Sequence, residues 1–204
     1  MLQNGENEIM GIFQKALLFA ADKHEGQYRK GNRLPYILHP MEVAAILSSL
    51  TTDEEILAAG VLHDTVEDAG VTPEELRRIF GDRVADLVAS ETEDKHGGGS
   101  AEQTWRRRKE TSLRVLRESE DLAVRMLWLG DKLSNMRSFA RQYRKEGDAM
   151  WQHYHEKDPA TQAWYYRTVE KELAVLAEYD AYDEYVQLTN EIFASVPRTT
   201  ESNE

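Results

Sequence analysis

The stretch GVLHDTVED (60–68) combines an apolar helical pattern with four polar side chains that can carry chemistry. Adjacent residues of a helix point about 100° apart, so His63 and Asp64 can flank one ion. Glu67 and Asp68 follow four residues later and would lie over the same two positions of a continuous helix. Three acids and a histidine on one face repel each other unless a cation or a solvated cleft relieves them. The exposed side of an ordinary amphipathic helix is the alternative interpretation.

Helical periodicity continues on both sides of this stretch, and we find no internal repeat and no convincing alternating strand. We therefore predict an all-α fold in a single domain covering 1–204, with a core over about 7–145 and a C-terminal helical extension over about 158–195. Capping patterns mark several helix starts. The residues that we expect at these starts are Pro40, a cap among Thr51, Thr52 and Asp53, Thr72-Pro73 and Asp158-Pro159.

Composition narrows the classes of function. The 204 residues carry a formal charge of −12, which disfavours binding to nucleic acid or to anionic membranes but allows a small phosphorylated ligand. The absence of cysteine excludes disulfides, thiolate metal sites and thiol nucleophiles. The N-terminal residues do not resemble a signal peptide, and no apolar run is long enough to span a bilayer. We therefore expect a cytoplasmic protein.

Two further residues extend the cluster of candidate metal ligands. His39 stands in LPYILHP (34–40), where Pro40 fixes how the chain enters a helix and so where the imidazole points. Asp131 follows the apolar run VRMLWLG (124–130), so its carboxylate is expected to be buried. A buried carboxylate needs a partner, which could be Lys132, an arginine elsewhere in the chain or a metal ion. His39, His63, Asp64 and Asp131 together form a ligand set without sulfur, which suits a divalent ion such as Mn²⁺, Fe²⁺, Zn²⁺ or Co²⁺.

This order of residues resembles the HD phosphohydrolase superfamily, and more closely the hydrolase domain of RelA/SpoT proteins and the small alarmone hydrolases. Four blocks carry the resemblance in order, from about Ala20 to Ser138. They are AADKHEGQYRKGNRLPYILHP, AAGVLHDTVEDAGVT, FGDRVADLVASETEDK and LGDKLSNMRS. The chain departs from the family pattern at Gly130 and Ser134, neither of which is a ligand position.

The resemblance implies an HD-type helical bundle with additional C-terminal helices, which converts ppGpp to GDP and pyrophosphate with one divalent metal ion, usually Mn²⁺. It implies that Glu67 and Asp68 position and deprotonate the attacking water, and that the metal acts as Lewis acid and water activator. It also implies hydrolysis without synthesis, because few residues follow the last block. The substrate-contacting residues that it implies are Arg29, Lys30, Lys95, Asn135 and, by a looser match, Tyr165 or Tyr166.

Other interpretations stay open at this point. The chain could be an HD nucleotidase for another phosphorylated nucleotide, or a non-catalytic nucleotide-binding relic. The basic run over 106–109 could face substrate phosphates, although such a run is typical of a solvated helix face. We interpret His24 as structural, His96, His153 and His155 as exposed, and the tryptophans as core or interface residues. The C-terminal helices could pack on the core or on a second copy in a homo-oligomer.

Overall fold

The computed structural model of the protein describes residues 10–29, 33–93 and 100–198. The prediction of an all-α fold is confirmed, since the described part consists of helices and connecting loops without a sheet. An isolated antiparallel bridge joins Tyr28 to Pro35 and closes the loop that leads to His39. No helix of the described part combines the length and apolar character that a membrane span requires.

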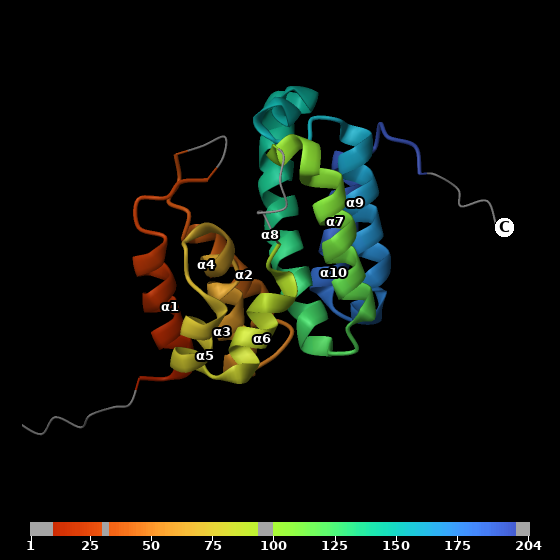
Figure 1. The fold of residues 1–204 in the computed structure, drawn as a ribbon. Coiled ribbons are helices and arrows are strands. Elements are labelled where there is room, and N and C mark those ends of the chain that lie inside the picture. The colour runs from red at the N-terminus through yellow and green to blue at the C-terminus, as the bar shows by residue number, and fades with distance from the viewer. Residues whose placement is uncertain (1–9, 30–32, 94–99, 199–204) are drawn as a thin grey trace, which may run out of the picture.

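The helices form two groups on either side of the long helix α8 (Figure 1). The N-terminal group consists of α1 (Ile12–Lys23), α2 (Leu38–Leu47), α3 (Glu54–Leu62), α4 (Thr65–Asp68), α5 (Pro73–Phe80) and α6 (Asp82–Glu91). The central helix is α8 (Leu122–Glu146), which continues into the 3-10 helix η1 (Gly147–His153). The second group begins with α7 (Ala101–Glu118). It ends with α9 (Pro159–Glu172), the 3-10 helix η2 (Ala174–Leu176) and α10 (Asp180–Ile192).

Several predicted helix starts are confirmed by their capping hydrogen bonds. The side chains of Asp53, Thr72 and Asp158 accept hydrogen bonds from backbone N–H groups at the starts of α3, α5 and α9. Ser100 begins α7 with a reciprocal pair of bonds to Gln103, a capping box. Pro40 lies in the first turn of α2.

The helix predicted to run through GVLHDTVED is interrupted. The structure ends α3 at Leu62 and begins α4 at Thr65, so His63 and Asp64 form a turn between two helices. Two side chains bond backbone carbonyl groups at the break. His63 Nδ1 donates to the carbonyl oxygen of Gly60, and the Thr65 hydroxyl donates to that of Leu62. Such local bonds compete with the helical ladder. The turn places the side chains of His63 and Asp64 at the C-terminal end of α3.

Two glycines let α2 approach α3 and α8 closely. A Cβ atom on Gly130 would lie 3.2 Å from both Leu47 Cγ and Val43 Cγ1. A Cβ atom on Gly60 would overlap Leu47 Cδ1. Gly60 lies one turn before His63, and Gly130 directly precedes Asp131. The close packing of α2 therefore brings His39 near both of these residues.

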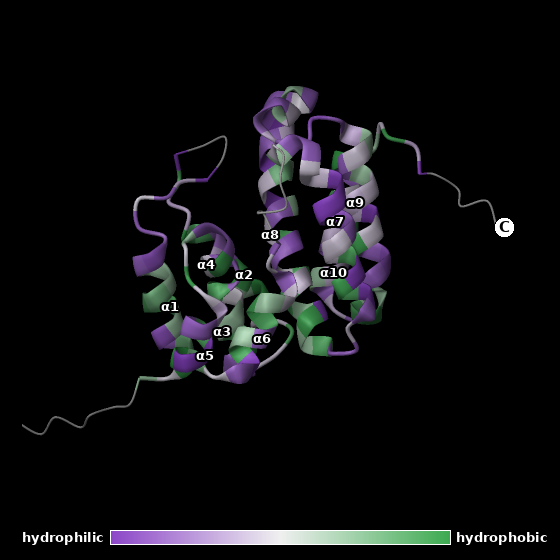
Figure 2. Cartoon of the chain, viewed as in Figure 1, coloured by the Kyte–Doolittle hydropathy of each residue, from purple (hydrophilic) through white to green (hydrophobic). Residues whose placement is uncertain are grey.

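The core is continuous through both groups of helices. Trp128, Trp151 and Tyr165 are among its largest fully buried side chains, and Trp105 is also buried, which confirms a core role for three of the tryptophans. Figure 2 shows apolar and polar residues on opposite sides of many helices, as expected for amphipathic helices around a shared core. Salt bridges from Arg137 to Glu184 and from Arg144 to Glu191 join α8 to α10. The two pairs lie about two helical turns apart.

Candidate metal centre

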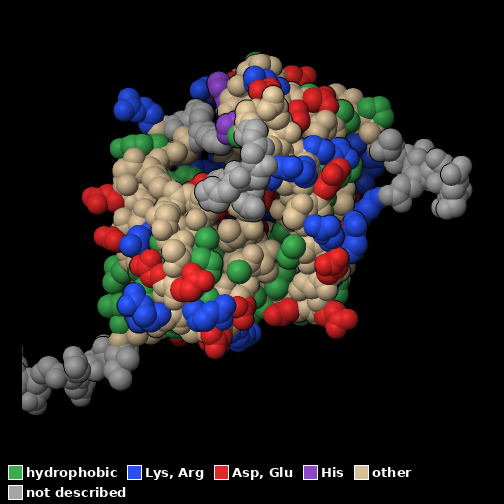
Figure 3. Space-filling view, viewed as in Figure 1, with side chains coloured by type: hydrophobic (Ala, Val, Ile, Leu, Met, Phe, Trp, Pro, Cys, Tyr) green, Lys and Arg blue, Asp and Glu red, His purple; other side chains and the backbone are tan. Residues whose placement is uncertain are grey.

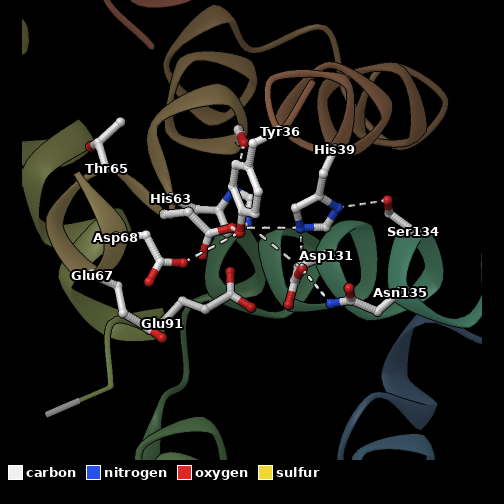
Figure 4. A network of polar contacts seen from close by, with 12 residues as sticks. Tyr36, His39, His63, Thr65, Glu67, Asp68, Glu91, Asp131, Ser134 and Asn135 are labelled. Atoms are coloured by element: carbon white, nitrogen blue, oxygen red, sulfur yellow. Dashed lines mark hydrogen bonds and ion pairs between the residues drawn. The ribbon is translucent and has the colours of Figure 1, made fainter. Parts of the chain in front are cut away.

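Three elements bring two imidazoles and a carboxylate together in the interior. His39 comes from α2, His63 from the end of α3 and Asp131 from α8 (Figure 4). All three residues are buried, and one ligand atom from each lies within 4.8 Å of the others. A cluster of this kind meets the geometric requirement of a metal site.

Asp64 completes the group of predicted ligands. Its Oδ2 atom lies 3.0 Å from His63 Nε2 and 3.6 Å from His39 Nε2. The Oδ1 atom of Asp131 lies 2.9 Å from His39 Nε2 and 3.6 Å from His63 Nε2. The structure therefore brings together all four residues that the sequence singled out, with both Nε2 atoms facing carboxylate oxygens.

Hydrogen bonds on the outer side fix the orientation of both imidazoles. The Nδ1 atom of His63 lies 2.9 Å from the carbonyl oxygen of Gly60 and must donate to it. The Nδ1 atom of His39 lies 2.8 Å from Ser134 Oγ, and Ser134 donates its own proton to Glu42 Oε2 over 2.7 Å. Since Nδ1 carries the proton in both rings, a neutral ring presents the lone pair of Nε2 to the centre.

This arrangement fits a cation. The Nε2 atom of His63 is buried and has no hydrogen-bond partner among the described residues, although Asp64 Oδ2 is near. Lone pairs of two imidazoles and two carboxylates repel each other unless a proton or metal ion lies among them. Burial lowers the pKa of His39. Burial also opposes protonation of His63, but Asp64 and Asp131 raise its pKa well above the ordinary value. The donor set suits a divalent ion of borderline or hard character.

Asp131 has the buried partner that its sequence context required. Lys132 Nζ lies 2.5 Å from Asp131 Oδ2 and 3.0 Å from Glu91 Oε1. Asn135 Nδ2 donates to Asp131 Oδ1 over 2.7 Å. Burial raises the pKa of Glu91 to about 8, although the ammonium group of Lys132 favours its charged form. Lys132 therefore satisfies one oxygen of Asp131 and leaves the other directed at the imidazoles.

Tyr36 and Glu91 are site residues that sequence reasoning missed. The hydroxyl of Tyr36 donates to Asp64 Oδ2 over 2.6 Å and lies 3.4 Å from Asp68 Oδ2. Burial, together with the neighbouring Asp64 carboxylate, raises the pKa of Tyr36 well above its ordinary value, so it keeps its proton. The spacing of Tyr36 from His39, three residues in LPYILHP, is a signal that could have found it. Glu91 offered a weaker signal, its place as the first residue of ETEDK (91–95).

Glu67 and Asp68 lie beside the ligand cluster, as Figure 4 shows. Both line the same cavity as the predicted ligands. The Oε2 atom of Glu67 accepts a hydrogen bond from the backbone N–H of Glu93 over 3.1 Å. This bond ties the carboxylate of Glu67 to the segment that follows α6. The two acids are therefore placed to act on a group held in the cavity.

The cavity has a volume of about 350 Å³ and is lined by three of the predicted substrate-contacting residues. Arg29 donates to Asn135 Oδ1 over 3.2 Å, and its guanidinium lies 5.6 Å from the centre of the Tyr36 ring. The hydroxyl of Tyr165 is buried and has no hydrogen-bond partner among the described residues. Tyr166, Trp105 and the exposed His155 also line the cavity. Lys30 and Lys95 lie outside the described residues.

The chain belongs to the HD domain family, whose model matches residues 16–157. A GTP pyrophosphokinase from Myxococcus xanthus is 37% identical over 131 residues, and a guanosine-3′,5′-bis(diphosphate) 3′-pyrophosphohydrolase from Aquifex aeolicus is 40% identical over 136 residues. These stretches cover 63% and 65% of this chain, but only 17% and 19% of the two relatives. The chain therefore corresponds to a small part of these longer proteins.

Two solved structures match over nearly their whole length. A structure from Listeria monocytogenes has a TM-score of 0.67 and 34% identity, and the match covers 76% of this chain and 99% of that one. A structure described as a metazoan ortholog of SpoT that hydrolyses ppGpp has a TM-score of 0.68 and 26% identity. That match covers 91% of this chain and 96% of the other. The likeness thus extends into the C-terminal helices.

Proposed function

We propose that the protein hydrolyses the 3′-pyrophosphate of guanosine alarmones and converts ppGpp to GDP and pyrophosphate. The observation that carries this proposal is the convergence of His39, His63, Asp64 and Asp131 beside the acidic pair Glu67 and Asp68, in a cavity that cationic side chains also line. The names of the Aquifex relative and the metazoan structure support the same reaction.

The four predicted ligands would hold one divalent ion, and Mn²⁺ is the ion that we propose. When bound, the ion supplies Lewis acidity and makes a nearby water a better nucleophile at neutral pH. The chain determines the orientation of the donors. Gly60 and Ser134 fix the imidazole rings, Tyr36 holds an oxygen of Asp64, and Lys132 holds an oxygen of Asp131.

Glu67 is the proposed general base, and Asp68 orients the water together with Tyr36. In the reaction, a water oxygen bonds to the phosphorus on the ribose 3′ oxygen, and the bond from phosphorus to that 3′ oxygen breaks. Glu67 takes a proton from the water, and the 3′ oxygen leaves as the hydroxyl of GDP once it gains a proton. Arg29, Asn135 and Tyr165 would contact the substrate, as would Lys30 and Lys95.

The fold supports the proposal of one domain over 1–204, because α8 packs against helices of both groups and ion pairs join it to α10. The net charge of −12 supports a small nucleotide as the partner rather than nucleic acid or a membrane surface, and a cytoplasmic location agrees with this composition. A homo-oligomer built through the C-terminal helices remains a prediction.

Product release from ppGpp by the purified protein tests the proposed function. We expect GDP and pyrophosphate to form with Mn²⁺ and not with chelator, and we expect Asp64→Ala to abolish both metal binding and turnover. Metal binding without turnover of ppGpp would favour a nucleotidase for another phosphorylated nucleotide. Binding of ppGpp without any turnover would favour a relic, and a chain that binds no metal would contradict the proposed centre.

A further inference from the structure

The basic run over 106–109 divides between two faces of α7. Arg108 and Lys109 line the cavity, and so do Ala101, Thr104 and Trp105. These five positions are spaced by three, one, three and one residues, which places them on one face of a helix. Arg106 instead pairs with Glu110 and lies 3.3 Å from the centre of the Trp164 ring. Arg107 does not line the cavity and instead lines a second groove between α6 and α7, which Arg108 and Glu93 also border.

Arg108 and Lys109, hereafter the α7 basic pair, converge on one carboxylate. Glu93 accepts a hydrogen bond from Arg108, and Lys109 Nζ lies 2.5 Å from its Oε1 atom. The side chains are 13%, 19% and 7% exposed for Arg108, Lys109 and Glu93. The ammonium group of Lys109 also lies 4.8 Å from the centre of the Tyr165 ring. Glu93 therefore holds two partly buried cations toward the cavity.

The metal side of the cavity is rich in carboxylates. Asp64, Glu67, Asp68 and Asp131 line it beside the cations Arg29 and Lys132, in a protein whose net charge is −12. One divalent ion and Arg29 would serve the phosphate that is attacked, since Arg29 bonds Asn135, which donates to the predicted ligand Asp131. A guanosine alarmone carries a second diphosphate on its 5′ oxygen. We expect this diphosphate to need cations of its own, and α7 is a separate element from those that supply the predicted metal ligands (Figure 1). Figure 3 shows Lys and Arg side chains on the side of the molecule that holds α7.

We propose that the α7 basic pair binds the 5′-diphosphate of the nucleotide, the group that the reaction leaves intact. This inference rests on the proposed function for the identity of the nucleotide. The Nε, Nη1 and Nη2 atoms of Arg108 already donate to Thr104, Glu93 and Ala101. This leaves one N–H on each of Nη1 and Nη2 for phosphate oxygens, and Lys109 adds a point charge. Glu93 keeps both cations in place, because partly buried cations without a carboxylate would be costly.

Binding of GDP and guanosine tests the proposal without requiring turnover. The affinities are measured by calorimetry in the presence of chelator, so that no metal competes for the diphosphate. We expect GDP to bind about 10- to 100-fold more tightly than guanosine, the difference expected from charge-assisted hydrogen bonds. Arg108→Gln should remove most of this preference without changing the affinity for guanosine. Lys109→Gln should weaken the preference for GDP while Arg108 still pairs with Glu93. This second variant keeps the proposal testable if Arg108→Gln fails to fold.

The adjacent residue provides a matched control. Arg107→Gln changes the charge of the same helix equally but lies outside the cavity, so it should keep the preference for GDP. Equal GDP affinity in the wild type, Arg108→Gln and Lys109→Gln would overturn the proposal. An equal loss in Arg107→Gln, or a parallel loss of guanosine affinity, would also overturn it. If the wild type prefers GDP but does not hydrolyse ppGpp, the result would support this binding site and contradict the proposed function. Turnover of ppGpp without a preference for GDP would do the reverse.

Discussion

The Nδ1 atom of His39 lies 2.8 Å from the hydroxyl oxygen of Ser134, across the interface between α2 and α8. Ser134 is 1% exposed and donates its proton to Glu42, so it can only accept from His39. Glu42 in turn lies 3.5 Å from Arg137, which pairs with Glu184 on α10. A relay of polar contacts thus connects the C-terminal helix to a proposed metal ligand.

This relay predicts that Ser134 controls metal affinity. Ser134→Ala removes the acceptor for His39 Nδ1–H and leaves a buried donor unpaired, so the imidazole loses its fixed orientation. We expect the affinity for Mn²⁺ to fall by about 10- to 100-fold, the usual effect of losing an outer hydrogen bond to a metal ligand. Calorimetric titration of the metal-free protein measures this change directly.

Two further variants separate this effect from a general loss of packing. Ser134→Thr keeps the hydroxyl and should retain most of the affinity. Ser138→Ala makes the same change one turn later on α8 and should leave metal binding unchanged. Unchanged affinity in Ser134→Ala would show that the relay does not support the metal centre.

Glu67 is predicted to act in the chemical step and not in metal binding. Glu67→Gln keeps the size of the side chain and an oxygen that can accept from the Glu93 N–H, but it cannot take a proton. We expect kcat to fall by about 10²- to 10⁴-fold, the range for loss of a general base, with metal affinity maintained. The measurement pairs turnover of ppGpp with metal content, and Glu74→Gln on the exposed side of α5 serves as the control. Loss of bound metal in Glu67→Gln would instead make Glu67 a ligand.

The predicted ligands were accessible from the sequence because their chemistry is visible in residue type and spacing. His63 and Asp64 are adjacent, and a proline fixes the position after His39. The all-α class followed from periodicity in the same way. The helix break at His63 was not predicted, because the apolar pattern continues through it. The side-chain bonds to Gly60 and Leu62 span only three residues, a spacing that a continuous helix also offers.

Contacts between distant elements explain the other misses. Tyr36 and Ser134 are ordinary residues until the fold places them on Asp64 and His39, which lie 28 and 95 residues away. The basic run over 106–109 was interpreted as more typical of a solvated face. In the structure, however, Arg108 and Lys109 line the cavity, and Arg106 and Arg107 do not. Only the position of α7 beside the cavity shows that Arg108 and Lys109 point inward. Sequence spacing gives the relative directions of side chains on a helix, but not what the helix faces.

The close approach of α2 predicts that Gly60 cannot accept a larger residue without cost. In Gly60→Ala, the new methyl group would overlap Leu47 Cδ1, and Leu47 is fully buried. Overpacking of this kind costs about 1–3 kcal/mol, which outweighs the roughly 1 kcal/mol gained from helix propensity. Urea denaturation should therefore show a lower free energy of unfolding. Leu47→Ala should cost less stability in the Gly60→Ala background than in the wild type, because the new methyl group occupies part of the space that the truncation opens. A more stable Gly60→Ala protein would show that α2 can move away freely.

The ion pairs of Glu93 predict a specific dependence of stability on pH. Burial by itself would raise the pKa of Glu93, but Lys109 and Arg108 outweigh it and lower that pKa. A carboxyl group with a lowered pKa in the folded state stabilises the protein above its unfolded pKa. That contribution is lost as the pH falls through the lowered folded value. Glu93→Gln cannot titrate, so it lacks this contribution at every pH.

We therefore expect the wild type to exceed Glu93→Gln by about 2 kcal/mol in free energy of unfolding at neutral pH, the scale of charged hydrogen bonds that are lost. The difference should shrink as the pH falls below the ordinary range of glutamate, because the wild-type carboxyl group also becomes neutral there. Urea denaturation of both proteins across the acid range measures this difference. Glu110→Gln, which removes an exposed pair with Arg106 on the same helix, should cost much less at any pH. A difference in free energy of unfolding that stayed constant into the acid range would mean that packing, and not charge, makes Glu93 important. In that case the α7 basic pair would need no anion to hold it in place.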